Sequence, residues 1–99
     1  MSSLQDIYKA ARDSARLETV EAWLQDWFAG RGARPQRDEN YFDAGAIDSF
    51  GIIEMIEAVE SHFKFAFHQH DFQDRRFATI AGLAEIVDER VQALSISRE

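Results

Sequence analysis

Ser49 is the residue of this chain whose type and position best suit chemistry. It follows the small, turn-prone segment Asp43-Ala44-Gly45-Ala46-Ile47-Asp48, and an amphipathic run comes directly after it. Serine and aspartate are preferred at helix N-caps, so we expect Asp48 or Ser49 to cap a helix. That arrangement leaves a hydroxyl at the N-terminus of the helix, where it can be modified, act as a nucleophile, or serve only as a cap.

A catalytic serine is one alternative for this position. Ser49-Phe50-Gly51 matches half of a nucleophile elbow, but Ile47 stands where the elbow has its first glycine, and no strand precedes the serine. None of the three histidines of the chain is placed near Ser49 by the sequence. We therefore expect no catalytic residue, and a protein that is not itself an enzyme.

A metal site is a second alternative. Asp43 and Glu54 are spaced as positions one and twelve of a calcium-binding loop, but positions three and five lack a side-chain oxygen, and Asp48 replaces the glycine at position six. The two histidines and the aspartate within residues 68–71 are too few for a structural metal site, which needs three or four ligands in a fixed geometry. No metal is expected.

Apolar residues at helical spacing define the elements that must position Ser49. The fold expected is all-α, a small bundle of three main helices plus a short third helix, with an N-terminal helical extension. The main helices are expected over residues 17–28, 49–63 and 80–91, and the short one within residues 71–77. The domain boundaries expected are an extension at 1–15, a folded domain at 16–93, and a frayed tail at 94–99.

Local signals mark the ends of these helices. Asp13-Ser14 is a plausible break between the extension and the first main helix, and Gly30 is expected to end that helix in the left-handed conformation. Thr79 is a possible cap for the last helix. Either Tyr41 or Phe42 should be buried, and Phe42 is the candidate anchor of the preceding loop.

Two connectors are expected between the helices. Residues 31–37 contain the only proline, a glycine and three arginines, and they are interpreted as a solvated connector in preference to a basic contact patch. Residues 63–67 alternate like a strand, but the chain offers no pairing partner, so they are expected to form an extended connector that buries aromatic rings.

Charge is unevenly distributed along the chain. The net charge is −7, and all of it falls between residues 38 and 60, which contain seven acids and no base. This argues against nucleic-acid binding, because neutralising phosphates requires clustered Lys and Arg. The chain has no cysteine, and neither a leader nor a membrane span is recognisable. We expect a soluble, cytoplasmic monomer.

Several of these features together resemble the acyl and peptidyl carrier protein family, in particular its stand-alone members. The segment from Phe42 to Phe50 is close to the family pattern of an apolar residue, an aspartate, a glycine, and then Asp-Ser-Leu. Phe63 and the sequence Phe77-Ala78-Thr79-Ile80 also match family positions. The likeness covers most of the chain, from about residue 17 to 91.

The resemblance implies a function for Ser49. In that family the serine carries 4′-phosphopantetheine, which a phosphopantetheinyl transferase (holo-carrier synthase) attaches from coenzyme A with magnesium. The thiol of the arm holds acyl or aminoacyl groups as thioesters, which a loading ligase supplies and acyl-transferring enzymes receive. The expected surface for these partners is formed by Asp48, Phe50, Ile53, Glu54, Glu57 and Glu60.

Departures from the family pattern refine this expectation. Phe50 replaces the usual leucine, and Gly51 stands where fatty-acid carriers often have an acid. Residues 68–76 contain two histidines and two arginines where fatty-acid carriers are strongly acidic. We therefore expect a specialised lipid or secondary-metabolic pathway. The alternative is a non-catalytic helical interaction module in which Ser49 is only a helix cap.

Overall fold

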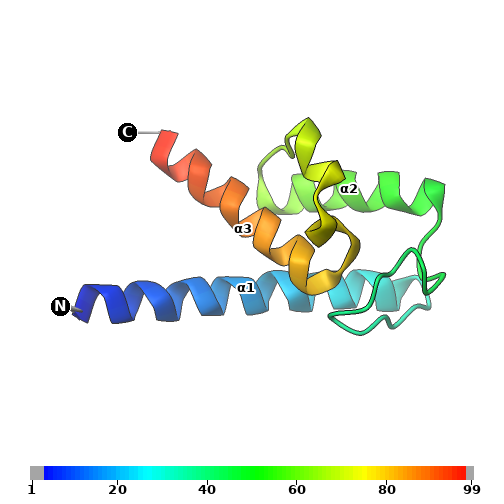
Figure 1. Ribbon diagram of the computed structural model, residues 1–99, viewed down its shortest axis with the longest axis horizontal. Helices are drawn as coiled ribbons and strands as arrows, with labels where there is room; N and C mark the ends of the chain where they lie inside the picture. The colour runs from blue at the N-terminus through cyan, green and yellow to red at the C-terminus, as the bar shows by residue number, and fades with distance from the viewer. Residues whose placement is uncertain (1–3, 98–99) are drawn as a thin grey trace.

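Helices make up the regular structure of this protein. The computed structural model describes the backbone of residues 4–97 and the side chains of residues 16–94, and this part contains no strand, which confirms the all-α prediction. The elements are α1 (Leu4–Gly30), α2 (Ser49–Phe63), the 3₁₀ helices η1 (Gln69–Gln73) and η2 (Arg75–Ala78), and α3 (Ile80–Ser97). In Figure 1, α2 runs back along α1, α3 crosses obliquely, and both termini lie at the same end.

The first helix is longer than expected. α1 is one helix of 27 residues, so the break predicted at Asp13-Ser14 is wrong. Aspartate and serine lower helix propensity by no more than about 0.7 kcal/mol each, which does not interrupt a helix that continues on both sides. The N-terminal part of α1 extends beyond the other elements (Figure 1). The proposed boundaries at residues 15 and 93 stay predictions, although α3 continues to Ser97.

The core lies where the helical periodicity predicted it. The three helices and the connectors each contribute to one cluster of buried apolar side chains. These are Val20, Leu24 and Phe28 of α1; Met55 and Val59 of α2; Ile80, Leu83, Ala84, Ile86 and Val87 of α3; and Tyr41, Ile47, Phe65 and Phe77. The connector after α2 buries Phe65 without forming a strand, as predicted.

Tyr41 anchors the loop that precedes α2. Its side chain is fully buried, its hydroxyl donates to the carbonyl oxygen of Phe77, and its N–H donates to the carbonyl oxygen of Ala78 at 3.0 Å. Phe42, the candidate anchor in the sequence, is instead 41% exposed. The tyrosine is preferred inside because its hydroxyl finds a buried acceptor there.

Replacing Tyr41 by phenylalanine is expected to lower the free energy of unfolding by about 1–3 kcal/mol, because the carbonyl of Phe77 loses its donor.

Burial raises the pKa of Tyr41 above its ordinary value of about 10. The folded state therefore binds this proton more tightly, and the stability it contributes is lost as the pH rises above about 10. Urea unfolding at pH 7 and pH 11 measures both effects, and an equal alkaline loss in the variant would contradict the second.

α1 ends in a Schellman motif. The N–H of Ala33 donates to the carbonyl of Phe28 at 3.0 Å, and the N–H of Gly32 donates to that of Ala29 at 3.0 Å. The left-handed residue is therefore Gly32, with a φ of +82°, and not Gly30 as predicted. α1 does end at Gly30, but the left-handed residue that completes the motif comes two positions later.

Two buried carboxylates tie the helices together. Asp88 of α3 pairs with Arg16 of α1 and accepts a hydrogen bond from Gln92 at 2.8 Å. Asp71 of η1 accepts from Arg90 Nε at 3.1 Å and from the N–H of His68 at 2.8 Å. Buried charges are costly unless they are paired in this way, so these contacts fix the relative positions of α1, η1 and α3.

Candidate functional site

Ser49 begins α2 as an exposed first residue. Asp48 is the N-cap: its backbone is extended, with φ −112° and ψ −175°, and its Oδ1 accepts from the N–H of Gly51 at 2.7 Å. The structure thus decides between the two predicted caps. The Ser49 side chain makes no hydrogen bond within the described part of the chain, so its hydroxyl is left available at the N-terminus of the helix.

Replacing Asp48 by alanine is expected to lower the free energy of unfolding by about 1 kcal/mol, because the N–H of Gly51 loses its acceptor. Asp48→Asn keeps a side-chain oxygen in the same place and is the matched control. Urea unfolding followed by circular dichroism measures both variants. Equal losses in the two would show that the charge of Asp48, and not its capping oxygen, is what matters.

A short capped turn leads the chain to Ser49. Asn40 Oδ1 accepts from the N–H groups of Phe42 at 2.9 Å and Asp43 at 3.0 Å, and the turn ends at Gly45, whose φ is +72°. Ile47 is then buried directly before the cap. The role of Asn40 was missed by the sequence analysis, although asparagine before a turn is a recognisable signal.

Gly51 has a packing role that the sequence does not reveal. It is buried, and an added Cβ would lie 2.9 Å from Cγ1 of Ile47, 3.2 Å from Oδ1 of Asp48 and 3.4 Å from Nη2 of Arg31. Glycine is therefore needed in the first turn of α2 so that the cap, the buried isoleucine and the arginine can approach the helix. Gly51 therefore matters for packing, and not only because it lacks an acidic side chain.

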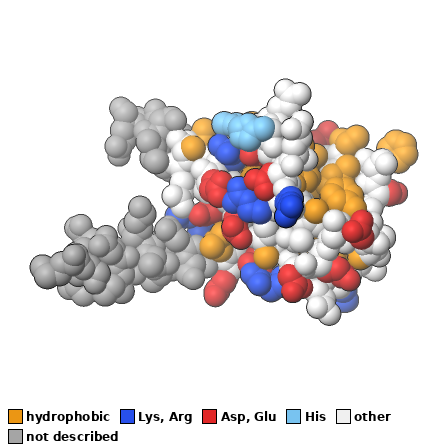
Figure 2. Space-filling model, in the orientation of Figure 1, with side chains coloured by type: hydrophobic (Ala, Val, Ile, Leu, Met, Phe, Trp, Pro, Cys, Tyr) orange, Lys and Arg blue, Asp and Glu red, His pale blue; other side chains and the backbone are white. Residues whose placement is uncertain are grey.

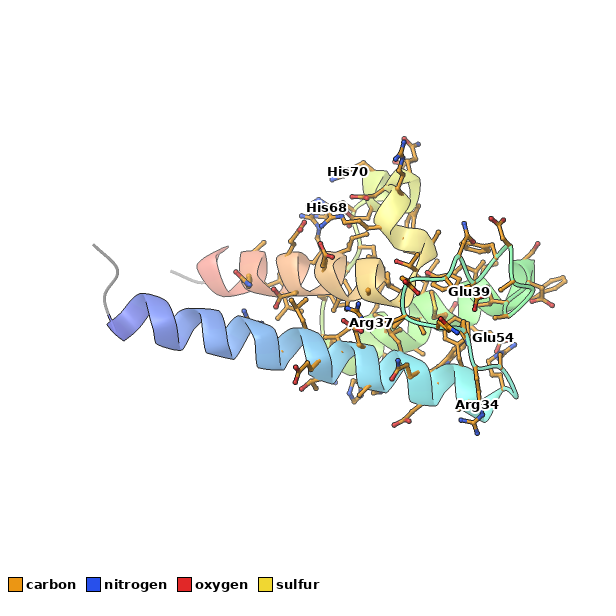
Figure 3. The ribbon with its side chains drawn as sticks, turned by 60° about the horizontal axis from the view of Figure 1, so that its bottom comes forward. Arg34, Arg37, Glu39, Glu54, His68 and His70 are labelled. Carbon is orange, nitrogen blue, oxygen red and sulfur yellow. The ribbon has the colours of Figure 1, made fainter. Side chains whose placement is uncertain are left out.

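The arginines of the connector after α1 contact the helices around them. Arg31 Nη1 lies 2.6 Å from Oε2 of Glu54, and its guanidinium carbon lies 4.9 Å from the ring centroid of Trp27. Arg37 binds Glu21 through two hydrogen bonds of 2.8 Å. Arg31 and Arg37 stay exposed despite these contacts, and Arg34 is exposed and points outward (Figure 3), so the loop is solvated as predicted.

Three of the four acids predicted for a partner surface have partners inside the chain. Asp48 caps α2, Glu54 pairs with Arg31, and Glu60 Oε2 accepts from the N–H of Phe67 at 2.9 Å. Glu57 is exposed and has no such partner within the described part of the chain. Three of these acids are therefore engaged in hydrogen bonds or an ion pair within the chain.

Exposed apolar side chains also lie beside Ser49. Phe50 is 78% exposed and Ile53 is 56% exposed. Figure 2 shows apolar side chains gathered over the half of this face in which α2 begins. Large apolar residues grouped on a surface often mark a place where a partner binds.

An open apolar groove of about 300 Å³ lies beside α2. It is lined by Phe42, Ile52, Ile56, Phe72, Asp74, Phe77 and Ala78. Ile52 and Ile56 follow Ser49 by three and seven residues, so they share its side of the helix. Met55 and Val59 are fully buried and belong to the core.

Within the described residues, the geometry gives no support to a catalytic serine or to a metal site. His62 stacks on Trp23, with ring centroids 4.9 Å apart, in the last turn of α2. His68 and His70 lie beside and within η1, well apart from Glu54 (Figure 3). Among the residues that the structure describes, no group of three or more His, Cys, Asp or Glu could hold a metal ion. No described helix is long and apolar enough to cross a membrane.

The fold and this site define a small helical carrier-like domain, in which a free serine hydroxyl stands at a capped helix N-terminus beside an apolar groove. Comparison with known families agrees: the model of the family described as "Phosphopantetheine attachment site" matches residues 28–87. The chain belongs to this family. No solved structure matches the chain significantly.

Membership of the family implies a covalently attached 4′-phosphopantetheine group. The residues at the start of α2 fit such a group, because Ser49 offers an exposed hydroxyl and the first turn of the helix offers free N–H groups. A helix N-terminus favours a nearby negative charge by about 0.3–1 kcal/mol at an exposed site. Domains of this family are generally non-catalytic and interact with phosphopantetheinyl transferases and acyl-handling enzymes.

Proposed function

We propose that Ser49 is the attachment site and that the protein is an acyl carrier without catalytic activity of its own. The observation that carries this proposal is the free, exposed hydroxyl of Ser49 beside the Asp48 cap. Because Asp48 satisfies the capping requirement, Ser49 is not needed for the helix and its oxygen is available for a new bond.

In the modification, the bond between Ser49 Oγ and the phosphorus atom forms as a pyrophosphate P–O bond of coenzyme A breaks. Adenosine 3′,5′-bisphosphate leaves, and the hydroxyl proton passes to a base of the transferase. The attached arm supplies a terminal thiol that holds acyl or aminoacyl groups as thioesters. The thiol is imported because the chain has no cysteine.

For the chain itself, we propose that Ile52 and Ile56 of the groove shelter the apolar part of a carried group, since they lie on the Ser49 side of α2.

The cations of residues 68–76 support service in a specialised pathway. Arg75 is exposed there, while Arg76 is held by Asp74 at 2.9 Å and Glu89 at 2.5 Å. A loading ligase and an acyl-transferring enzyme are the expected partners, and the cytoplasm is the expected location.

The intact mass of the protein tests this function. The protein is incubated with coenzyme A, magnesium and a broad-specificity phosphopantetheinyl transferase, and the product is digested to map the modified peptide. The expected result is a gain of one phosphopantetheinyl group on the peptide that contains Ser49. A folded protein that gains no mass would favour the helical interaction module, in which Ser49 has no chemical role.

A further inference from the structure

The first part of α1 carries an apolar stripe of its own. The helix is continuous from Leu4 to Gly30, and its N-terminal part runs beyond the other elements (Figure 1). Residues three and four positions apart share one face of a helix. The apolar positions that fall on one face of residues 4–15 by this rule are Leu4, Ile7, Tyr8, Ala11 and Ala15.

This stripe lies on the side of α1 opposite to the bundle. Ala11 precedes the buried Val20 by nine positions, and Ala15 precedes the buried Leu24 by nine positions. Nine residues make about two and a half turns of an α-helix, so the stripe and the core positions are on opposite sides of α1. Because α1 continues without a break at residues 13–14, the core that covers Val20 and Leu24 does not reach around to the stripe.

The same part of the chain has no share in the net negative charge. Residues 1–15 contain Lys9 and Arg12 against Asp6 and Asp13, so their formal charges cancel, whereas the whole chain has a net charge of −7. Two copies that meet through their bundles bring like charges together, which opposes association. Two copies that meet through residues 4–15 avoid this repulsion.

The stripe is complementary to itself in side-chain size. Its N-terminal half contains Leu4, Ile7 and Tyr8, and its C-terminal half contains Ala11 and Ala15. In an antiparallel pair of these helices, the large residues of one copy are placed opposite the alanines of the other. Facing large and small residues let two helices pack closely, whereas a parallel pair would set large against large.

We infer that two copies of this chain associate through residues 4–15 as an antiparallel helix pair, with the apolar stripe as the contact. This goes beyond the proposed carrier function and departs from the monomer expected from the sequence. A two-fold axis through the pair sends the two bundles in opposite directions. Because α2 begins at the end of the molecule away from both termini (Figure 1), the two Ser49 residues stay accessible at the far ends of the dimer.

The association is weak, because the contact is small. The stripe has five residues in each chain, whereas each side of a stable interface contributes about 20–30 residues. We expect a dissociation constant on the order of 0.1 mM. The dimer therefore forms at high protein concentration and separates on dilution.

Sedimentation equilibrium of the full chain, at protein concentrations up to about 1 mM, tests this inference. The average mass of the wild-type protein is expected to rise with concentration from that of a monomer toward that of a dimer. Ala11→Glu places a charge in the apolar contact and is expected to raise the dissociation constant by about tenfold or more. Ala10→Glu is the matched control: it lies about 100° around the helix, outside the stripe, and is expected to change the constant by less than about twofold.

Two results would overturn the inference: a wild-type chain that stays monomeric throughout, or a dimer that both variants weaken equally. A monomer that instead binds vesicles of anionic phospholipid would assign the stripe to a membrane surface, which also overturns it. Circular dichroism confirms that both variants keep their helices. The proposed function is tested separately, because both variants are expected to gain one phosphopantetheinyl group at the wild-type rate.

Discussion

Ser49→Ala is expected to abolish the attachment of phosphopantetheine completely while leaving the fold intact. The substitution removes the only oxygen that the side chain offers, so no ester can form at this position. Its structural cost is small, because Ser49 is exposed and Asp48 supplies the cap. Alanine is also the best helix former, and we expect the free energy of unfolding to change by no more than about 0.5 kcal/mol.

Ser61→Ala is the matched control for this prediction, because Ser61 is an exposed serine of the same helix but lies near its C-terminal end. That variant should gain one phosphopantetheinyl group like the wild-type protein. Intact mass measures the modification and urea unfolding measures the stability. A mass gain that survives in Ser49→Ala would place the attachment elsewhere and refute the assignment.

Gly82→Ala is expected to destabilise the protein by about 3 kcal/mol, a large share of the stability of a small domain. Gly82 lies in the first turns of α3, where η2 packs directly on the helix. An added Cβ would lie 2.3 Å from the carbonyl oxygen of Arg76 and 2.6 Å from its Cα. These are backbone atoms, so the clash is relieved only by moving η2 away from α3.

Gly30→Ala is the control for this substitution. Gly30 is the last residue of α1, and apart from its chain neighbours and the backbone of its own helix no heavy atom lies within 4 Å of the position that its Cβ would take. Alanine there is expected to leave the stability unchanged or to raise it by up to about 0.5–1 kcal/mol. Thermal and urea unfolding measure both variants, and equal stabilities of Gly82→Ala and wild type would show that η2 can shift without cost.

Moving η2 away from α3 would also affect the candidate site. Phe77 and Ala78 belong to η2 and line the groove beside α2, and Tyr41 hydrogen-bonds to the backbone of both. A shift of η2 would therefore disturb the groove and the loop that leads to Ser49. Gly82 thus supports the candidate site although it touches neither the serine nor its cap.

Local chemistry was sufficient to predict the main elements of this protein. The apolar spacing of each main helix depends only on neighbouring residues, and the buried Leu24, Met55 and Leu83 follow that spacing within the expected ranges. Thr79 was predicted as a cap, and its hydroxyl accepts from the N–H of Gly82 at 2.9 Å. The junction at Asp48-Ser49 was also readable, because a cap followed by an amphipathic run is a local signal.

Contacts between distant residues were beyond the reach of the sequence. Tyr41, and not Phe42, became the buried anchor because the carbonyl of Phe77, 36 positions away, accepts its hydroxyl. Residues 38–60 contain no base, but Arg31, 23 positions before Glu54, pairs with its carboxylate.

The sequence by itself therefore determined the helices, their buried faces and the serine at the start of α2, since these follow from spacing and capping along a single segment. Only the tertiary structure decided which side chains stay free around that serine. Ion pairs, buried hydrogen bonds and close approaches such as those at Gly51 and Gly82 depend on which segments meet in space. Around Ser49 the structure leaves Phe50 and Ile53 exposed together with the engaged acids Asp48 and Glu54.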